Sequence, residues 1–200
     1  MYIIGITGGT GSGKTIALHA LEKQGTIALD CDEIYHELLD KNNDMKAEIE
    51  AHFNGILING AIDRKQLSEL VFNDKSALEK LNKITHKHVV DEVKRRLADW
   101  EKQGGTVAVI DAIALFESGV NELCNITVGI VAPVETRIKR IMKRDNITRE
   151  QAERRINAQK SDSFYIDNCD KVLENNYNTT EEFREKCVKM AEKALNGILN

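Results

Sequence analysis

Apolar and polar residues follow each other along the chain in blocks of different period, which separates expected strands from expected helices. Residues 2–7 form an apolar, β-branched run, typical of a strand buried on both faces of a sheet. Residues 14–24 carry apolar side chains at helical spacing, and Gly25 is a suitable end for that helix. A second short strand is expected over residues 26–29. A strand, a helix and a strand in this order predict a parallel α/β sheet.

The middle of the chain has a different pattern. From Glu33 to about Gln103 it is mostly polar, with apolar residues at helical spacing. Ser76 to Glu79 match a capping box and predict the start of a long helix there. The stretch richest in turn residues is Asn54 to Asp63. We expect helices here, part of which form an inserted lobe.

Strand patterns return in the second half of the chain, over residues 106–110 and 126–132, and a last strand is expected over residues 171–173. A capping box at Thr148–Gln151 predicts a helix that begins there. A second box at Thr179–Glu182 predicts a final amphipathic helix that reaches about Leu199.

Composition narrows the class of protein. The 200 residues suit one domain with an inserted lobe, and 42% hydrophobic with 30% charged residues is typical of globular proteins. A net charge of −4 argues against a nucleic-acid partner, and no apolar run is long enough for a membrane span. We expect no signal peptide and a cytoplasmic location. No CxxC pair occurs, so neither a disulfide framework nor a zinc site is expected for Cys31, Cys124, Cys169 and Cys187.

A glycine-rich segment between the first strand and the first helix matches G-x-x-x-x-G-K-[ST]. Its glycines let backbone N–H groups turn toward phosphate oxygens, and the following helix directs its positive end at the anion. Lys14 would reach the β- and γ-phosphates of ATP, and the Thr15 hydroxyl would hold Mg²⁺. The expected nucleotide-binding residues are Gly8, Gly9, Thr10, Gly11, Ser12, Gly13, Lys14 and Thr15.

A phosphate loop alone leaves the phosphate acceptor open between a metabolite kinase, a regulatory GTPase and a motor-type ATPase. The chain has no N-K-x-D segment to read guanine, and large ATPases usually need more chain. A basic stretch, residues 137–160, carries nine Lys or Arg against three acids. It favours a small kinase with its own lid, supplied by Arg137, Arg140, Arg144, Arg149, Arg154 and Arg155.

Carboxylates follow two of the expected strands. Asp30 and Asp32 come after the second strand, where one can accept a proton from an attacking hydroxyl and one can cap the next helix. Asp111 ends the apolar run from Val107, the Walker-B pattern, and is the expected second Mg²⁺ ligand.

Within the basic stretch, Arg140 and Arg144 are one helical turn apart and share a face, so both are expected to bind phosphate. The five histidines form no metal-binding pattern; surface or packing positions are expected for His86 and His88.

Taken together, these segments resemble the dephospho-coenzyme A kinase family over most of the chain. The phosphate loop alone is not specific, whereas the order and spacing of all the segments are. The segments that carry the resemblance are Ile4–Thr15 with its T-G-G, Asp30-Cys31-Asp32, Asp63-Arg64 with Val71-Phe72, Asp111–Glu117, and Arg144-Asp145 with Gln151-Ala152 and Arg155-Ile156-x-x-Gln159.

The resemblance implies an α/β P-loop NTPase fold of three layers, α/β/α, with a parallel sheet, a helical acceptor-binding insertion and a lid. It implies one domain over residues 1–200, with a core of residues 1–33 and 104–200, a lid of about 137–165 and a helical lobe of about 34–103. The implied reaction, the last step of coenzyme A synthesis, moves the γ-phosphate of ATP to the 3′-hydroxyl of dephospho-CoA.

By the same resemblance, Asp32 would be the base, and Lys14, Arg140 and Arg144 would stabilise the charge of the transferring phosphoryl group. A monomer is expected. Two departures bear on the acceptor: His86-Lys87 stands where the family usually has H-P, and Ile113-Ala114-Leu115 where it has P-L-L. They leave open a P-loop kinase with another acceptor such as a nucleoside or nucleotide. A nucleotide-binding regulatory protein without transfer activity is a separate alternative, against which Asp32 and the lid arginines argue.

Overall fold

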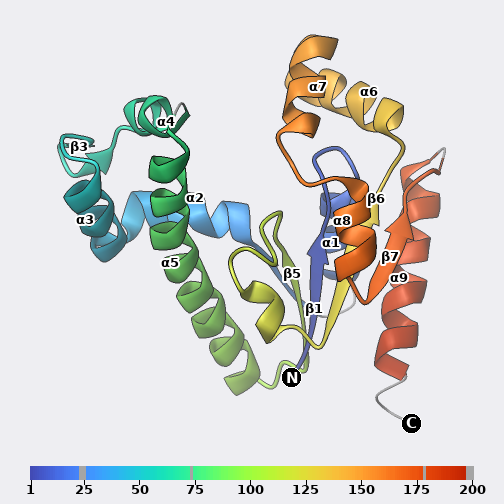
Figure 1. Ribbon diagram of the computed structural model, residues 1–200. Helices are drawn as coiled ribbons and strands as arrows, with labels where there is room; N and C mark the ends of the chain where they lie inside the picture. Colours follow the sequence, from blue (N-terminus) through green and yellow to red (C-terminus); the bar gives the residue numbers. More distant parts are fainter. Residues whose placement is uncertain (23–25, 73, 178, 197–200) are drawn as a thin grey trace.

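A five-stranded parallel sheet forms the centre of the computed structural model, with strands in the order β2-β5-β1-β6-β7 (Figure 1). The structure describes residues 1–22, 26–72, 74–177 and 179–196. The strands are β1 (Tyr2–Thr7), β2 (Ile27–Asp30), β5 (Val107–Asp111), β6 (Ile126–Val131) and β7 (Lys171–Glu174).

Helices cover both faces of this sheet, which gives three layers and confirms the predicted α/β class. On one face, α1 (Lys14–Glu22) and α9 (Thr180–Asn196) pack against residues of β1, β6 and β7 such as Ile4 and Ile130. On the other face, a second apolar cluster joins Ile110 of β5 to helices from the middle of the chain. Parallel strands buried on both faces explain why strand residues read as continuous apolar runs.

The middle of the chain builds a helical lobe beside the sheet, at the left of Figure 1. It contains a short hairpin that the turn-rich segment did not reveal, since each of its strands has two residues. The elements of the lobe are α2 (Cys31–Lys41), α3 (Asn43–His52), β3 (Leu57–Ile58), β4 (Ala61–Ile62), α4 (Arg64–Phe72) and α5 (Lys75–Lys102).

The long helix α5 starts earlier than predicted. Its N-cap is Asp74, whose carboxylate accepts a hydrogen bond from the Ala77 N–H at 3.0 Å, so the capping box predicted from Ser76 is wrong. The Asp74 carboxylate thereby satisfies one of the free N–H groups of the first turn, and Ser76 becomes part of the helix. The helix runs without a break through His86-Lys87, and near its end the Trp100 indole N–H donates to the Val107 carbonyl oxygen at 2.9 Å.

A second helical unit lies above the phosphate loop at the upper right of Figure 1. It is made of α6 (Val134–Asp145) and α7 (Arg149–Asn157), while α8 (Asp162–Asn168) lies below them against β6 and β7. A short 3-10 helix, η1 (Val120–Leu123), precedes β6. The capping box at Thr148 is confirmed, because its hydroxyl accepts from the Gln151 N–H while the Gln151 side chain accepts from the Thr148 N–H.

Other boundaries agree closely with the sequence pattern. Strand β2 lies one residue later than predicted, and the box at Thr179 is confirmed by reciprocal bonds with Glu182 at 3.3 Å. The predicted end of the first helix at Gln24 with Gly25, and of the last helix at Leu199, lie outside the described residues. All four cysteines are free thiols, and none of the described helices has the length and apolar character to cross a bilayer.

Candidate active site

The glycine-rich segment forms a tight loop between β1 and α1, at the carboxyl end of the sheet. Gly13 has φ +111°, and a Cβ there would lie 2.3 Å from the Asn175 side-chain nitrogen. Gly8 has φ +143°, and its Cβ would meet the Ile130 carbonyl oxygen at 2.2 Å. Glycine is required at both positions because the loop combines left-handed backbone with close packing.

A cleft of about 690 Å³ opens along this loop and brings the predicted phosphate-side residues together. Its positive groups come from the loop and from α6, and its negative groups come from the ends of β2 and β5. The charged residues and hydroxyl group that line it are Lys14, Thr15, Asp30, Asp32, Asp111, Arg140, Lys143 and Arg144.

The two carboxylates after β2 have different roles in the structure. Asp30 is the N-cap of α2, and one of its oxygens accepts from the N–H groups of Asp32 and Glu33 at 2.8 and 3.2 Å. Asp32 sits in the first turn of the helix, with its carboxylate open to the cleft. The capping alternative therefore applies to Asp30, and Asp32 is free for chemistry.

A second cavity, of about 280 Å³, lies between the helical lobe and the sheet. Asp32 lines this cavity as well as the cleft along the phosphate loop. Its walls are mainly apolar and come from α2, α5 and the loop after β5, and their polar groups include Tyr35, Asn82 and His86. Burial lowers the pKa of His86, which favours the neutral imidazole.

Two of the cleft carboxylates, Asp111 and Asp32, have a raised pKa and hold their protons more tightly than usual. Burial raises the pKa of Asp111 to about 7, opposed by the charge of Lys14 and increased by Asp30 and Asp32. Partial burial, followed by the charge of Asp30, also raises the pKa of Asp32, although its side chain is partly exposed. A carboxylate with a raised pKa is a stronger base, which suits proton transfer near neutral pH.

Asp111→Asn should stabilise the free protein, and more so at pH 8 than at pH 5. Folded Asp111 keeps its proton up to about pH 7 whereas the unfolded residue releases it near 3.8, so the folded state binds more protons between these values. Stability is therefore lost as pH rises through this window, and asparagine avoids a loss on the order of a few kcal/mol. Thermal melts of both proteins, with exposed Asp91→Asn as control, measure the difference; an equal gain at both pH values contradicts it.

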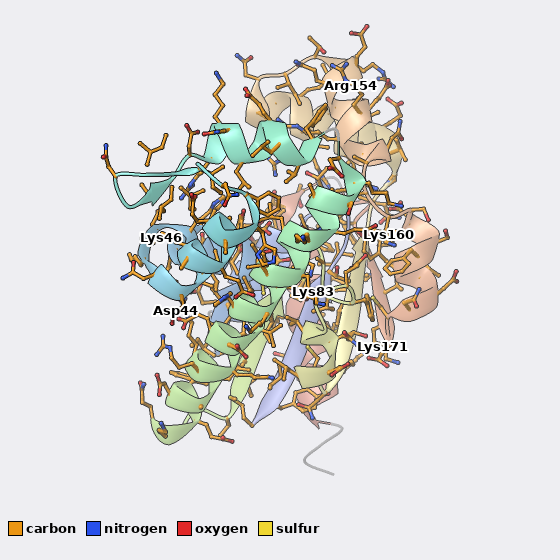
Figure 2. All side chains as sticks on the ribbon, turned by 60° about the vertical axis from the view of Figure 1, so that its left-hand side comes forward. Asp44, Lys46, Lys83, Arg154, Lys160 and Lys171 are labelled. Carbon is orange, nitrogen blue, oxygen red and sulfur yellow. The ribbon has the colours of Figure 1, made fainter. Side chains whose placement is uncertain are left out.

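Some arginines of the basic stretch lie near the phosphate loop, and others lie away from it. Arg140 donates to the carbonyl oxygens of Gly11 and Ser12 at 3.2 and 3.3 Å, and Arg144 lines the cleft while paired with Asp145 at 2.7 Å. Arg154 lies at the outer end of the lid (Figure 2).

The remaining three are bound elsewhere. Arg149 and Arg155 form ion pairs within the lid, with Glu135 and Asp145 respectively, while Arg137 is buried. The structure thus brings Arg140 and Arg144 to the cleft and leaves Arg149, Arg154 and Arg155 outside its lining.

Asn175 supports the loop from behind. It is 1% exposed, and its side-chain N–H donates to the Ser12 carbonyl oxygen at 2.7 Å while its oxygen accepts from Arg140 at 3.3 Å. The sequence patterns assign Asn175 no role, because a single buried amide after a strand has no distinctive spacing.

Asn175→Ala should destabilise the protein by about 1–3 kcal/mol, because the Ser12 carbonyl and the Arg140 guanidinium lose a buried partner. Nucleotide affinity should fall as well. Urea unfolding and ADP titration measure the two effects. Asn168→Ala, which removes an exposed bond to the Phe164 carbonyl, is the control and should change stability by less than about 0.5 kcal/mol. Equal effects of the two variants would contradict the support role.

The oxygen groups in the cleft fit a magnesium ion that is shared with phosphate. No set of three or more His, Cys, Asp or Glu side chains within the described ranges is placed to bind a metal alone. Mg²⁺ commonly takes one or two protein oxygens and completes its shell with phosphate and water. The Thr15 hydroxyl and the Asp111 carboxylate, both in the cleft lining, are groups of the required kind.

Comparisons with known proteins agree with the site. The sequence profile of the dephospho-CoA kinase family (CoaE) matches residues 2–181. A dephospho-CoA kinase of Fusobacterium nucleatum is 38% identical over 186 residues, covering 92% of this chain and 95% of the relative.

Solved structures extend the agreement to the fold. TT1252 from Thermus thermophilus has a TM-score of 0.82 at 29% identity, covering 97% of both chains. The dephospho-CoA kinase of Campylobacter jejuni has a TM-score of 0.69 at 28% identity, covering 98% of both chains. The profile spans the phosphate loop, the helical lobe and the lid, so this chain belongs to the dephospho-CoA kinase family.

Proposed function

We propose that the chain transfers the γ-phosphate of ATP to the ribose 3′-hydroxyl of dephospho-CoA, giving coenzyme A and ADP. The observation that carries this proposal is the position of Asp32, which lines both the phosphate-loop cleft and the lobe cavity. A nucleotide in one space and an alcohol in the other would meet at this carboxylate. Family membership supplies the identities of donor and acceptor.

Asp32 accepts the proton of the attacking hydroxyl. Burial and the charge of Asp30 raise its pKa, which makes it a more effective base than an ordinary aspartate. The neighbouring Asp30 holds the first turn of α2 in place through its two backbone hydrogen bonds. The geometry of Asp32 is therefore fixed by a helix cap, as a base that must be oriented requires.

Lys14, Arg140 and Arg144 stabilise the charge of the transferring phosphoryl group. Lys14 opens α1, so its ammonium adds to the positive end of that helix at the loop. Arg140 is held against the loop carbonyl groups, and Arg144 lies one turn further along α6 in the cleft lining. Fixed positive groups at the developing charge are the main source of rate in phosphoryl transfer.

The backbone N–H groups of the loop, residues 8–15, would cradle the phosphates of ATP. Thr15 and Asp111 would hold Mg²⁺, which supplies charge neutralisation to the phosphate oxygens when bound. The deprotonated form of Asp111 is the ligand, and the charge of Lys14 favours that form against its burial.

The acceptor occupies the cavity of the helical lobe. In this proposal the lobe spans residues 34–103, the core spans residues 1–33 and 104–200, and the lid within the core spans residues 137–165. The mainly apolar walls suit an extended thioalkyl arm, with polar groups at His86 and Asn82 for its ends. His86-Lys87 lies inside α5, and without a proline there the helix continues unbroken along the cavity wall. The protein works as a monomer.

ADP release from Mg-ATP, measured with and without dephospho-CoA in a coupled assay, tests the proposal. Release that requires dephospho-CoA is expected. If the protein binds nucleotide but releases no ADP in the presence of dephospho-CoA, the acceptor assignment is contradicted. A panel of nucleosides and nucleotides would then identify a different acceptor. If the protein binds nucleotide but releases no ADP with any acceptor, it is a regulatory protein.

A further inference from the structure

One residue of the phosphate loop, Thr10, is held by the lid through both of its backbone polar groups, the N–H and the carbonyl. Its N–H donates to the side-chain oxygen of Gln159 at 2.7 Å. Its carbonyl oxygen accepts from Nε of Arg137 at 2.9 Å. These partners are separated by 149 and 127 positions in the chain, and both belong to the basic stretch of the lid.

Arg137 reaches Thr10 from behind the loop and has no place in the cleft lining. It is 2% exposed, and its Nη1 forms an ion pair with Asp162 of α8 at 2.8 Å. It also packs closely on the loop, because a Cβ at Gly9 would lie 2.2 Å from its Nη2. A buried guanidinium with a fixed carboxylate partner makes this a rigid contact.

Gln159 is anchored in the same region. The next residue, Lys160, pairs with Glu117 of the loop after β5 at 3.6 Å and lies 4.9 Å from the centre of the Phe164 ring. Figure 2 labels Lys160 at the base of the lid. The segment 159–160 therefore contacts the phosphate loop with one side chain and the acceptor-side loop with the next.

We propose that Gln159 and Arg137 are positioning residues, which keep the phosphate loop in its transfer-competent shape only while the base of the lid is docked on Thr10. The proposal deepens the proposed function and rests on it, because it assumes that this loop binds the phosphates of ATP. Thr10 is the second of four variable residues in the loop, ahead of the helix-starting residues Gly13 to Thr15. Those later N–H groups can bind a nucleotide without the contact at Thr10.

The contact at Thr10 should therefore affect transfer more than binding. If the contact is lost, the loop must become ordered during the transfer step, which lowers kcat. A nucleotide that is bound mainly by the N-terminal end of α1 keeps its affinity. This division between kcat and affinity distinguishes a positioning residue from a nucleotide ligand.

The test uses three variants of the full-length protein. Gln159→Met keeps the length of the side chain and removes its hydrogen-bond acceptor. Gln159→Glu keeps an acceptor oxygen. Asn157→Ala changes an exposed residue two positions earlier and is the control. For each protein, the hydrogen exchange rate of the Thr10 amide is measured by NMR without nucleotide, together with kcat and the Kd for ADP.

Gln159→Met should speed exchange at Thr10 and lower kcat by about five- to tenfold each, the value of one neutral hydrogen bond, while the Kd for ADP changes less than about twofold. Gln159→Glu and Asn157→Ala should leave Thr10 protected. Unchanged exchange or unchanged kcat in Gln159→Met overturns the proposal, as does an equal loss of ADP affinity. If the unaltered protein shows no transfer to dephospho-CoA, the proposed function fails, and the exchange data still decide whether Gln159 holds Thr10.

Discussion

Replacing Lys14 with alanine is expected to abolish turnover, with a loss of several kcal/mol of transition-state stabilisation, or about 10²-fold or more in rate. The ammonium group belongs to the first residue of α1 and acts on the carboxylates of Asp32 and Asp111 in the cleft. Among the described residues that line the cleft, Lys14 is the cation that the loop side supplies, and the other cations come from α6. The rate of acceptor-dependent ADP formation under saturating Mg-ATP measures the effect.

Lys83→Ala is the matched control, because Lys83 is an exposed lysine of α5 in the helical lobe (Figure 2) and lines neither the cleft nor the lobe cavity. Its activity should equal that of the unaltered protein. A Lys14→Ala protein with near-normal activity would mean that the loop is not the phosphate site.

Asp32→Asn is expected to lower kcat by about 10²- to 10⁴-fold, the usual contribution of a general base, with little change in ATP affinity. The amide fills the same space and cannot take a proton, so the two cavities keep their shape. Because the pKa of Asp32 is raised by burial and by Asp30, the acid limb of the kcat profile should lie above the ordinary aspartate range and vanish in the variant.

Steady-state kinetics over a pH series, with ATP binding measured separately, distinguish the roles that Asp32 could have. Glu33→Gln, an exposed carboxylate at the next position of α2, is the control and should retain kcat. A loss confined to ATP binding would identify Asp32 as a residue of the metal shell or of the structure. An acid limb that persists unchanged in the variant would assign the titration to another group.

The sequence predicts best what depends on local spacing. The loop, its helix, and the strand ending at Asp111 all follow from short patterns with a physical requirement at each position. The pattern favours Asp32 as the catalytic carboxylate only slightly, because either Asp30 or Asp32 can cap a helix. Only the position of α2 relative to the cleft separates the cap from the free carboxylate.

What the sequence misses depends on contacts between distant segments. Asn175 and Gln159 reach the loop across more than 100 positions, and neither residue type carries a spacing rule for such a contact. Arg137 belonged to a charge run whose members look alike, although it alone among the six lid arginines is buried. The predicted start of α5 is wrong for another reason. Asp74 and Ser76 are both residue types that cap helices well, and the three-dimensional geometry decides which of them does so.

The unbroken helix α5 makes the lobe suitable for a distance measurement. Its 28 residues extend about 42 Å at 1.5 Å per residue, from the lobe tip to the Trp100 anchor at the base of the sheet. A rotation of about ten degrees at that base would move Lys75 by about 7 Å. A pair of fluorophores, one at the start of α5 and one on α9, would thus convert a small hinge movement on acceptor binding into a large change in energy transfer.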